Sequence, residues 1–200
     1  MSKNIEKTED GFSQVEKTLT NSEQFIEKNQ KLIIKIVGVV VVLLALFFVY
    51  RNYIQEPKIK EAQNQIYFAQ RYFDADSFRI ALNGDGNVLG FLDIADKYSS
   101  TPSGNLANLY SGICFLRLGE FQNAINSLEK FSSDDYLLSN MAKANMGDAY
   151  MELKDFKKAA AMYKAASEEN ANDLTTPYYL FKQGLALMQA SQNAEAVADF

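Results

Sequence analysis

The sequence contains no histidine, no tryptophan and a single cysteine, Cys114. Because imidazole is the usual general base of hydrolytic triads and a common zinc ligand, its absence excludes histidine-based acid–base catalysis and most zinc sites. One cysteine cannot close a disulfide within the chain, so stability must come from packing, and we predict that Cys114 is a small core residue. We expect a protein that is not an enzyme and that uses no metal or other cofactor. The carboxylates of Asp134 and Asp135 are better explained by helix capping or loop solvation than by catalysis.

Clustered positive charge is also lacking. Residues 51–200 carry a net charge of −5, and the densest basic group, Lys154 to Lys164, is interleaved with Asp155. Nucleic-acid binding requires clustered Lys and Arg that neutralise phosphates, so we expect no nucleic-acid partner. The chain also lacks the glycine-rich lysine motif that cradles phosphates, and we expect no small-molecule substrate.

Two hundred residues, of which 48% are apolar, are enough for one domain with an extension. The extension contains an apolar run, LIIKIVGVVVVLLALFFVY, at residues 32–50, whose only charge is Lys35. As a helix this run would be about 28 Å long, which matches the hydrocarbon core of a bilayer. A soluble core helix would keep a polar stripe, and a cleaved signal peptide would need a small-residue cleavage pair. Residues 32–53 are therefore predicted to be an uncleaved transmembrane helix in contact with membrane lipid.

The flanks of this helix do not fix its orientation, because three basic residues lie close to each end. The N-terminal segment, residues 1–31, has apolar and small side chains at helical spacings: Phe12, Val15, Leu19, Ser22 and Ile26. The pattern predicts a short amphipathic helix, which could be an interfacial helix. Its balanced charge gives little attraction to anionic lipid, and we favour a helix that merely continues into the anchor. After the anchor, Pro57 is expected to interrupt the helical run.

Internal repeats dominate the rest of the chain. Residues 108–131 and 143–166 superpose at an offset of 35 without a gap, and a third repeat, 180–200, follows 37 residues later. Equivalent positions alternate between small and large residues: Gly112, Gly147 and Gly184; Phe115, Tyr150 and Leu187; Ala124, Ala159 and Ala196; Leu128, Tyr163 and Phe200. Antiparallel helices approach closely only where a small residue faces its neighbour, so each repeat is predicted to be a helical hairpin. Gly119 can end a helix in the left-handed conformation, whereas Lys154 at the equivalent position should cost up to about 1 kcal/mol.

At these residues the chain resembles the tetratricopeptide repeat (TPR) family. The resemblance implies an all-α fold in which a single N-terminal transmembrane helix is followed by a solenoid of stacked hairpins. The repeats would span about 105–138, 140–173 and 177–200 within residues 104–200, the last one being incomplete. The chain departs from the family in lacking an aromatic residue near the start of the first helix, in placing Phe131 at a usually small position, and in having no proline to close the first two repeats. We expect further chain or a partner to cover the apolar edge around Ala194, Val197 and Phe200.

Residues 54–103 are predicted to be a degenerate first repeat. Its two amphipathic helices, at about 62–73 and 91–98, are joined by an enlarged turn over residues 74–90. Residues 83–87, NGDGN, suggest a calcium loop, but the EF-hand spacing and its final Glu are absent, and we favour a plain glycine-rich turn.

In the TPR register, the first helix of each hairpin would form a concave wall. Twelve residues are predicted to line this groove: Leu106, Leu109, Ile113, Leu116, Met141, Ala144, Asp148, Met151, Tyr178, Phe181, Leu185 and Met188. TPR co-chaperones that bind acidic tails carry Lys and Asn there, so we reject a carboxylate clamp. An apolar wall containing methionine suits an amphipathic helix or an extended hydrophobic segment of a polypeptide partner. The alternative is that some of these side chains pack against one another or against the helix at 58–73.

A signal anchor followed by an acidic TPR domain is similar to the layout of the ancillary Sec translocon subunit family of Gram-negative bacteria. The resemblance implies a single-pass protein of the bacterial inner membrane, with a cytoplasmic N-terminus and a periplasmic TPR domain. Its partners would be the SecYEG translocon, a membrane-anchored periplasmic chaperone and exported polypeptides, and its role that of an adaptor in protein transport. Two alternatives stay open: an envelope-assembly or cell-division scaffold that does not contact nascent chains, and a cytosol-facing receptor for import or sorting signals.

Overall fold

The computed structural model describes residues 3–169 and 171–198, with side chains for 25–26, 28–169 and 171–191. These residues form α-helices and one π-helical turn, and no strand occurs among them. The all-α fold class is therefore confirmed. The chain divides into two compact units, Met1–Gln55 and Glu56–Phe200.

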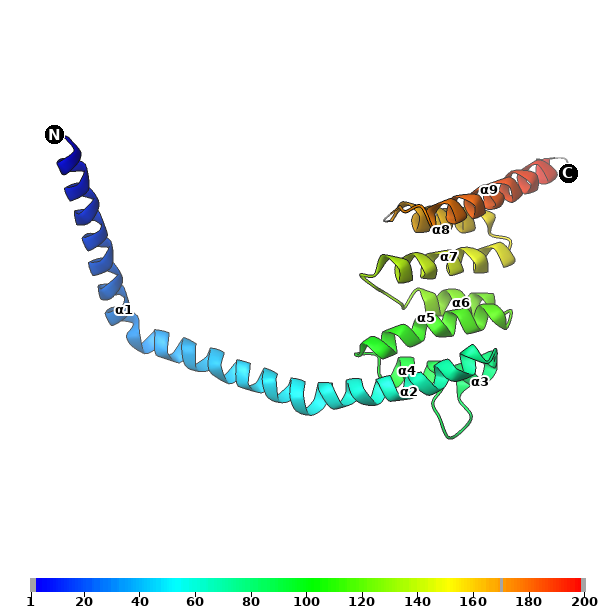
Figure 1. Cartoon of the computed structure of the whole chain (residues 1–200), viewed down its shortest axis with the longest axis horizontal. Coiled ribbons are helices and arrows are strands. Elements are labelled where there is room, and N and C mark those ends of the chain that lie inside the picture. The colour runs from blue at the N-terminus through cyan, green and yellow to red at the C-terminus, as the bar shows by residue number, and fades with distance from the viewer. Residues whose placement is uncertain (1–2, 170, 199–200) are drawn as a thin grey trace. The chain divides into compact units, whose positions relative to one another are not determined.

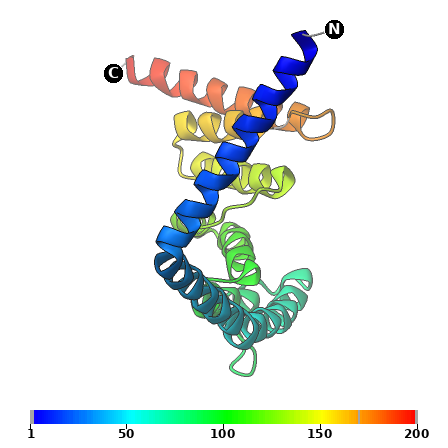
Figure 2. The same ribbon diagram turned by 90° about the vertical axis from the view of Figure 1, so that its left-hand side faces the viewer.

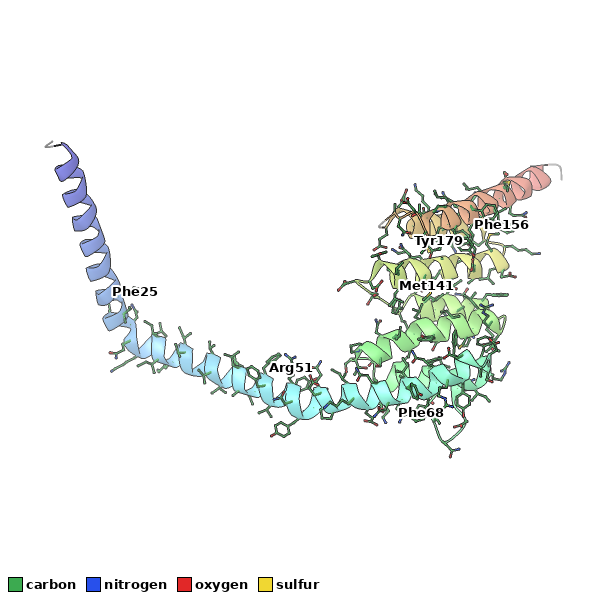
Figure 3. The ribbon with its side chains drawn as sticks, in the orientation of Figure 1. Phe25, Arg51, Phe68, Met141, Phe156 and Tyr179 are labelled. Carbon is green, nitrogen blue, oxygen red and sulfur yellow. The ribbon has the colours of Figure 1, made fainter. Side chains whose placement is uncertain are left out.

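The first unit is a single long helix, α1 (Lys3–Tyr50), followed by the π-helical turn Arg51–Gln55 (Figure 1). Its apolar side chains between Phe25 and Arg51 project outward from the helix, and none of those described is buried (Figure 3). It is the one helix in the described part of the chain that is long and apolar enough to cross a membrane. The helical conformation of residues 3–31 runs on into the apolar run, as favoured from the sequence, although the side chains of Phe12, Val15, Leu19 and Ser22 lie outside the described ones.

Pro57 does not end the helical run as predicted, but the regular α-helix is broken just before it, by the π-helical turn Arg51–Gln55. Helix α2 (Glu56–Asp74) begins at the residue before Pro57, directly after the π-helical turn. In a regular α-helix the proline ring collides with the carbonyl group four residues earlier, which here belongs to Tyr53. Tyr53 lies in the wider π-helical turn, where the backbone can carry that carbonyl away from the ring.

The second unit is a stack of helices in which successive elements pack on one another (Figure 1). After α2, these are α3 (Phe78–Asn83), α4 (Phe91–Lys97), α5 (Pro102–Arg117), α6 (Phe121–Leu128), α7 (Tyr136–Glu152), α8 (Phe156–Glu168) and α9 (Thr176–Ala198). Side-chain caps define three of the helix starts, because Thr101, Asp135 and Asp155 each accept a hydrogen bond from a backbone N–H of the following first turn. The cap at Asp135 agrees with the interpretation of that residue from the sequence.

The start of the stack contains the two predicted helices and one that was not predicted. Helices α2 and α4 bury Ile66 and Ile94, and Phe91 stacks on Tyr110 of α5 with ring centroids 4.9 Å apart. Helix α3 lies inside the expected turn because Ala81 and Leu82 add to the same core. Sequence reasoning missed it because a six-residue helix is too short to show a clear period.

The loop after α3 projects away from the helices (Figure 2). Gly84 and Gly86 have φ angles of 81° and 92°, which favour glycine. One carboxylate oxygen of Asp85 accepts hydrogen bonds from the backbone N–H groups of Asn87 and Val88, and the other accepts one from the Tyr72 hydroxyl. The hydrogen bond from Tyr72, followed by those from the backbone, lowers the pKa of Asp85. These bonds account for Asp85 as part of the turn.

The small-to-large pairing is present in the first two hairpins. A Cβ atom on Gly112 would lie 2.4 Å from Cγ of Leu128 on α6, and one on Gly147 would lie 2.6 Å from Cε1 of Tyr163 on α8. Both glycines therefore sit at tight contacts between paired helices, and the predicted hairpins α5–α6 and α7–α8 are confirmed.

The third repeat is different, and its predicted hairpin is wrong. Helix α9 continues from Thr176 to Ala198 without a turn, and among the described residues an added Cβ on Gly184 would meet no atom within 4 Å beyond its neighbours in the chain and the backbone of its own helix. Ser191 replaces Gly119 at the turn position and cannot enter the left-handed conformation without a cost in free energy. In the described part of the chain, no helix contacts α9 at Gly184 to offset that cost. The side chains of Ala194, Ala196, Val197 and Phe200 lie outside the described ones.

Replacing Lys154 by glycine is expected to stabilise the protein. Lys154 has a φ angle of 61° at the turn of the second hairpin, where Gly119 of the first hairpin has 76°. A side chain in this conformation costs about 1 kcal/mol of stability. Removing it should therefore raise the melting temperature by about 3 °C. Circular dichroism of the full chain in mild detergent measures this change. Gly119→Ala is the matched control and should lower the melting temperature; a lower value for Lys154→Gly would contradict the prediction.

Candidate protein-binding surface

The twelve predicted groove residues lie on α5, α7 and α9, but two of them are not on the surface. Leu109 is buried against Leu128 and Ala142, and Ala144 is buried against Ala166 and Tyr179. Both side chains face the next layer of the stack rather than the solvent. The prediction that they line an open groove is therefore wrong. The sequence pattern could not separate these positions, because a solenoid helix is apolar both where it meets the following repeat and where it lines a groove.

Several other predicted residues are half-buried in contacts within the unit. Leu106, Ile113, Leu116 and Met141 pack against the cluster of Leu109, Leu128 and Ala142, and Met151 packs against the cluster containing Tyr163. Figure 3 labels Met141 on α7 and Tyr179 on α9 at the same end of the stack. In this part of the predicted wall, the side chains therefore pack against one another instead of lining an open groove. This is the alternative that the sequence left open.

A pocket of about 220 Å³ brings three of the predicted residues together: Ile113 and Leu116 of α5 and Asp148 of α7. Four residues that were not predicted complete its lining: Arg117, Phe121, Asn145 and Glu152. Asn145 and Glu152 lie three residues before and four after Asp148, a spacing that could have revealed them. Phe121 begins α6, and only the folded hairpin brings it to this pocket. The pocket is consequently more polar than the sequence suggested.

Helix α9 presents the remaining four predicted residues to solvent. Tyr178, Phe181, Leu185 and Met188 have exposed fractions between 38% and 64%. Their spacing of three, four and three residues places them on one side of the helix, which we term the α9 apolar face. A cluster of large apolar side chains that none of the described residues covers is typical of a surface that binds another protein.

A polar network fixes α9 to the preceding hairpin. Lys182 Nζ lies 2.7 Å and 2.9 Å from the two carboxylate oxygens of Asp148, and the Tyr163 hydroxyl donates a hydrogen bond of 2.5 Å to the same carboxylate. The Lys182 ammonium group also lies 4.9 Å from the centre of the Tyr178 ring. The network thus joins α7, α8 and α9 and positions Tyr178 on the α9 apolar face.

Electrostatics within the network follow from these contacts. Burial, followed by the hydrogen bond to Asp148, raises the pKa of Tyr163, because both favour the neutral phenol. Burial alone would lower the pKa of Lys182, but its hydrogen bonds to Asp148 and Tyr178 outweigh burial and raise it. Lys182 is therefore held in its charged form. The sequence placed Asp148 on the wall but did not indicate Lys182 as its partner.

Cys114 is expected to be unreactive in the folded protein. Its side chain is fully buried, and burial raises the pKa of the thiol to about 12, so the nucleophilic thiolate is scarce at neutral pH. N-Ethylmaleimide should label Cys114 only after unfolding in urea, as mass spectrometry can measure. Ser133→Cys, in the loop after α6, is the control and should react within minutes. Equally fast labelling of native Cys114 would contradict its core position.

No protein-family model, curated protein or solved structure matches this chain. Among the described residues, no group of three or more Cys, Asp and Glu side chains is arranged to hold a metal ion. The chain is an all-helical protein with a long, unburied apolar helix near its N-terminus and packed helix pairs after it.

Proposed function

We propose that the protein is a membrane-anchored adaptor of the TPR type that binds polypeptide segments on the α9 apolar face. The exposure of Tyr178, Phe181, Leu185 and Met188 on one side of a helix carries the proposal. Such a face accepts an amphipathic helix or an extended hydrophobic segment, and the unbranched side chain of Met188 can adapt to partners of different shape. The adaptor catalyses no reaction.

The pocket beside α7 refines the kind of segment that would be bound. The carboxylates of Asp148 and Glu152 line it, and they disfavour an acidic tail. Arg117 is the one basic residue of the lining. An apolar segment without terminal acidic residues is therefore the preferred ligand, in keeping with the rejection of a carboxylate clamp.

The anchor would keep the binding surface close to the membrane. α1 is unburied and long enough to cross a bilayer, and a tether of this kind raises the local concentration of a weak binding surface near membrane-bound partners. Together with the TPR-like repeats, this layout supports a role as an accessory subunit of the Sec translocon in the bacterial inner membrane. The helical unit would then lie in the periplasm, where it assists exported proteins and a membrane-anchored chaperone.

Site-specific photocrosslinking tests this function. A benzophenone amino acid at Phe181 should form adducts with a translocating precursor and with translocon subunits in intact membranes. The same probe at Lys164, an exposed polar position on α8, is the control and should give few adducts. Adducts only with envelope-assembly or cell-division proteins would favour the scaffold alternative, and the absence of adducts specific to Phe181 would overturn the proposal.

Orientation is tested separately. In a Cys114→Ala background, Ser133→Cys should react with a membrane-impermeant maleimide added from the periplasmic side. Labelling only after the inner membrane is permeabilised would place the helical unit in the cytosol and favour a receptor for sorting signals instead.

A further inference from the structure

The outer side of α2 carries an exposed stripe that combines aromatic and basic side chains. Tyr67 and Phe68 are 57% and 42% exposed, and Lys60 and Arg71 are exposed as well. Their spacing along the helix places all four on the side opposite the three buried residues of α2. Figure 3 labels Phe68 on this helix. We term these four residues the α2 stripe.

The two cations of the α2 stripe are available to pair with an anionic surface. Among the described residues, neither Lys60 nor Arg71 lies within ion-pair distance of a carboxylate. The acidic residue between them in the sequence, Glu61, is already paired with Lys97 at 3.1 Å. The other two acidic residues of α2 are its first and last residues. The stripe therefore combines positive charge and aromatic rings with no unpaired carboxylate between its two cations.

A hollow of about 310 Å³ lies beside the C-terminal end of the α2 stripe. It is lined by Phe68, Arg71, Tyr72, Ala75 and Val88. The guanidinium of Arg71 is the one charged group of this lining, and the Tyr72 hydroxyl is already hydrogen-bonded to Asp85. A guanidinium next to apolar walls suits a phosphate group that carries apolar chains, which is the chemistry of a phospholipid.

The chain connection keeps the start of α2 within reach of lipid headgroups. Only Arg51–Gln55 separate the apolar run at 32–50 from α2. Even a fully extended connection of this length spans no more than about 20 Å, so α2 begins close to the headgroups when the apolar run is in a bilayer. Tyrosine rings and basic side chains are the groups that favour this region of a membrane.

We infer that the α2 stripe binds the surface of a membrane that contains anionic phospholipid. Tyr67 and Phe68 enter the headgroup region, and Lys60 and Arg71 pair with lipid phosphates. The inference rests on the membrane anchor of the proposed function but not on its protein ligands, because the α9 apolar face belongs to a different helix.

Single tryptophans test the contact, because the sequence contains none of its own. The full chain is reconstituted in nanodiscs of phosphatidylglycerol and phosphatidylcholine with brominated acyl chains, since bromine quenches only a nearby indole. Tyr67→Trp should be quenched to at least about half the extent of Phe47→Trp in the apolar run. Tyr136→Trp, at a position 42% exposed on α7, is the matched control and should not be quenched. If α2 instead pointed away from the bilayer, position 67 would lie about 16 Å beyond the start of α2, out of reach of the bromine.

Charge reversal tests the role of the two cations. In the Tyr67→Trp background, Lys60→Glu combined with Arg71→Glu should lower the ratio of lipid-bound to free stripe by at least about tenfold, with a matching loss of quenching. Both side chains are exposed, so the fold should be retained, which circular dichroism verifies. Lys130→Glu combined with Lys157→Glu changes the net charge equally at exposed positions elsewhere and should leave quenching unchanged.

The outcomes separate this inference from the proposed function. Quenching of Phe47→Trp without quenching of Tyr67→Trp would overturn the inference, leave the anchor in place and favour a protein as the occupant of the α2 stripe. Absence of quenching for Phe47→Trp would show that the apolar run does not enter the bilayer, and would overturn the anchor and the inference together. Equal quenching of Tyr67→Trp and Tyr136→Trp, or quenching that resists the charge reversal, would overturn the inference as well.

Discussion

Replacing Gly147 by valine is expected to lower the free energy of unfolding by about 3 kcal/mol. A Cβ atom at this position would lie 2.6 Å from the ring of Tyr163, and the ring is almost completely buried, so it has no space into which to move. The two further methyl groups of valine increase the overlap. For a unit of this size, the change corresponds to a fall of about 9 °C in melting temperature, which circular dichroism of the full chain in mild detergent can measure.

The other two repeats supply matched variants for this prediction. Gly112→Val should have a similar effect, because Cγ of Leu128 lies 2.4 Å from the added Cβ. Gly184→Val should change stability by no more than about 0.5 kcal/mol, since the space beside Gly184 is open. If the three variants had equal effects, the hairpin contacts described for the first two repeats would be wrong.

Replacing Asp148 by alanine is expected to destabilise the protein by about 2 kcal/mol. The substitution leaves the ammonium group of Lys182 and the hydroxyl of Tyr163 without their shared acceptor in a half-buried site. A fully buried pair would lose more, but the side chains of Asp148 and Lys182 are 36% and 22% exposed, and water partly replaces the lost contacts. The melting temperature in mild detergent measures the effect, and photocrosslinking from Phe181 should weaken as α9 loosens.

Lys158→Ala is the matched control for this network. Lys158 pairs with Asp155 at 2.9 Å, but its side chain is 63% exposed, so the melting temperature should stay nearly unchanged. A loss of stability from Lys158→Ala as large as that from Asp148→Ala would show that the network has no special role in holding α9.

The network also predicts how stability changes with pH. The folded-state pKa values of Tyr163 and Lys182 are both raised. For each group, the stabilisation is fully present below the unfolded-state pKa, which is about 10 for both, and is lost as the pH rises through the folded value. The melting temperature of the unmodified chain should therefore fall above about pH 10 more steeply than that of Asp148→Ala. Parallel curves for the two proteins would contradict this coupling.

Sequence reasoning succeeded where a local pattern has one structural solution. The apolar run at 32–50 has no polar stripe with which to face water, which favoured a membrane helix over a soluble core helix, and none of its described side chains is buried in the structure. The repeated spacing from Gly112 to Leu128 and from Gly147 to Tyr163 predicted close contacts between paired helices. The structure has both contacts. The turn at Lys154 likewise kept the geometry of Gly119 despite the change of side chain.

It failed where two tertiary outcomes share one pattern. Leu109 and Phe181 occupy equivalent apolar positions, yet the first is buried against α7 and the second is exposed, because within the described residues a following layer of helices covers only the first.

The amino-acid sequence by itself thus determined the long apolar helix near the N-terminus, the all-helical class and the two close hairpins, because each depends on contacts or solvation within a short stretch of chain. Only the tertiary structure decided that α9 runs straight, that Asp148 is shared by Tyr163 and Lys182, and which apolar side chains remain accessible. Those outcomes depend on which layers meet in space, and burial is a property of the assembled stack rather than of any one helix.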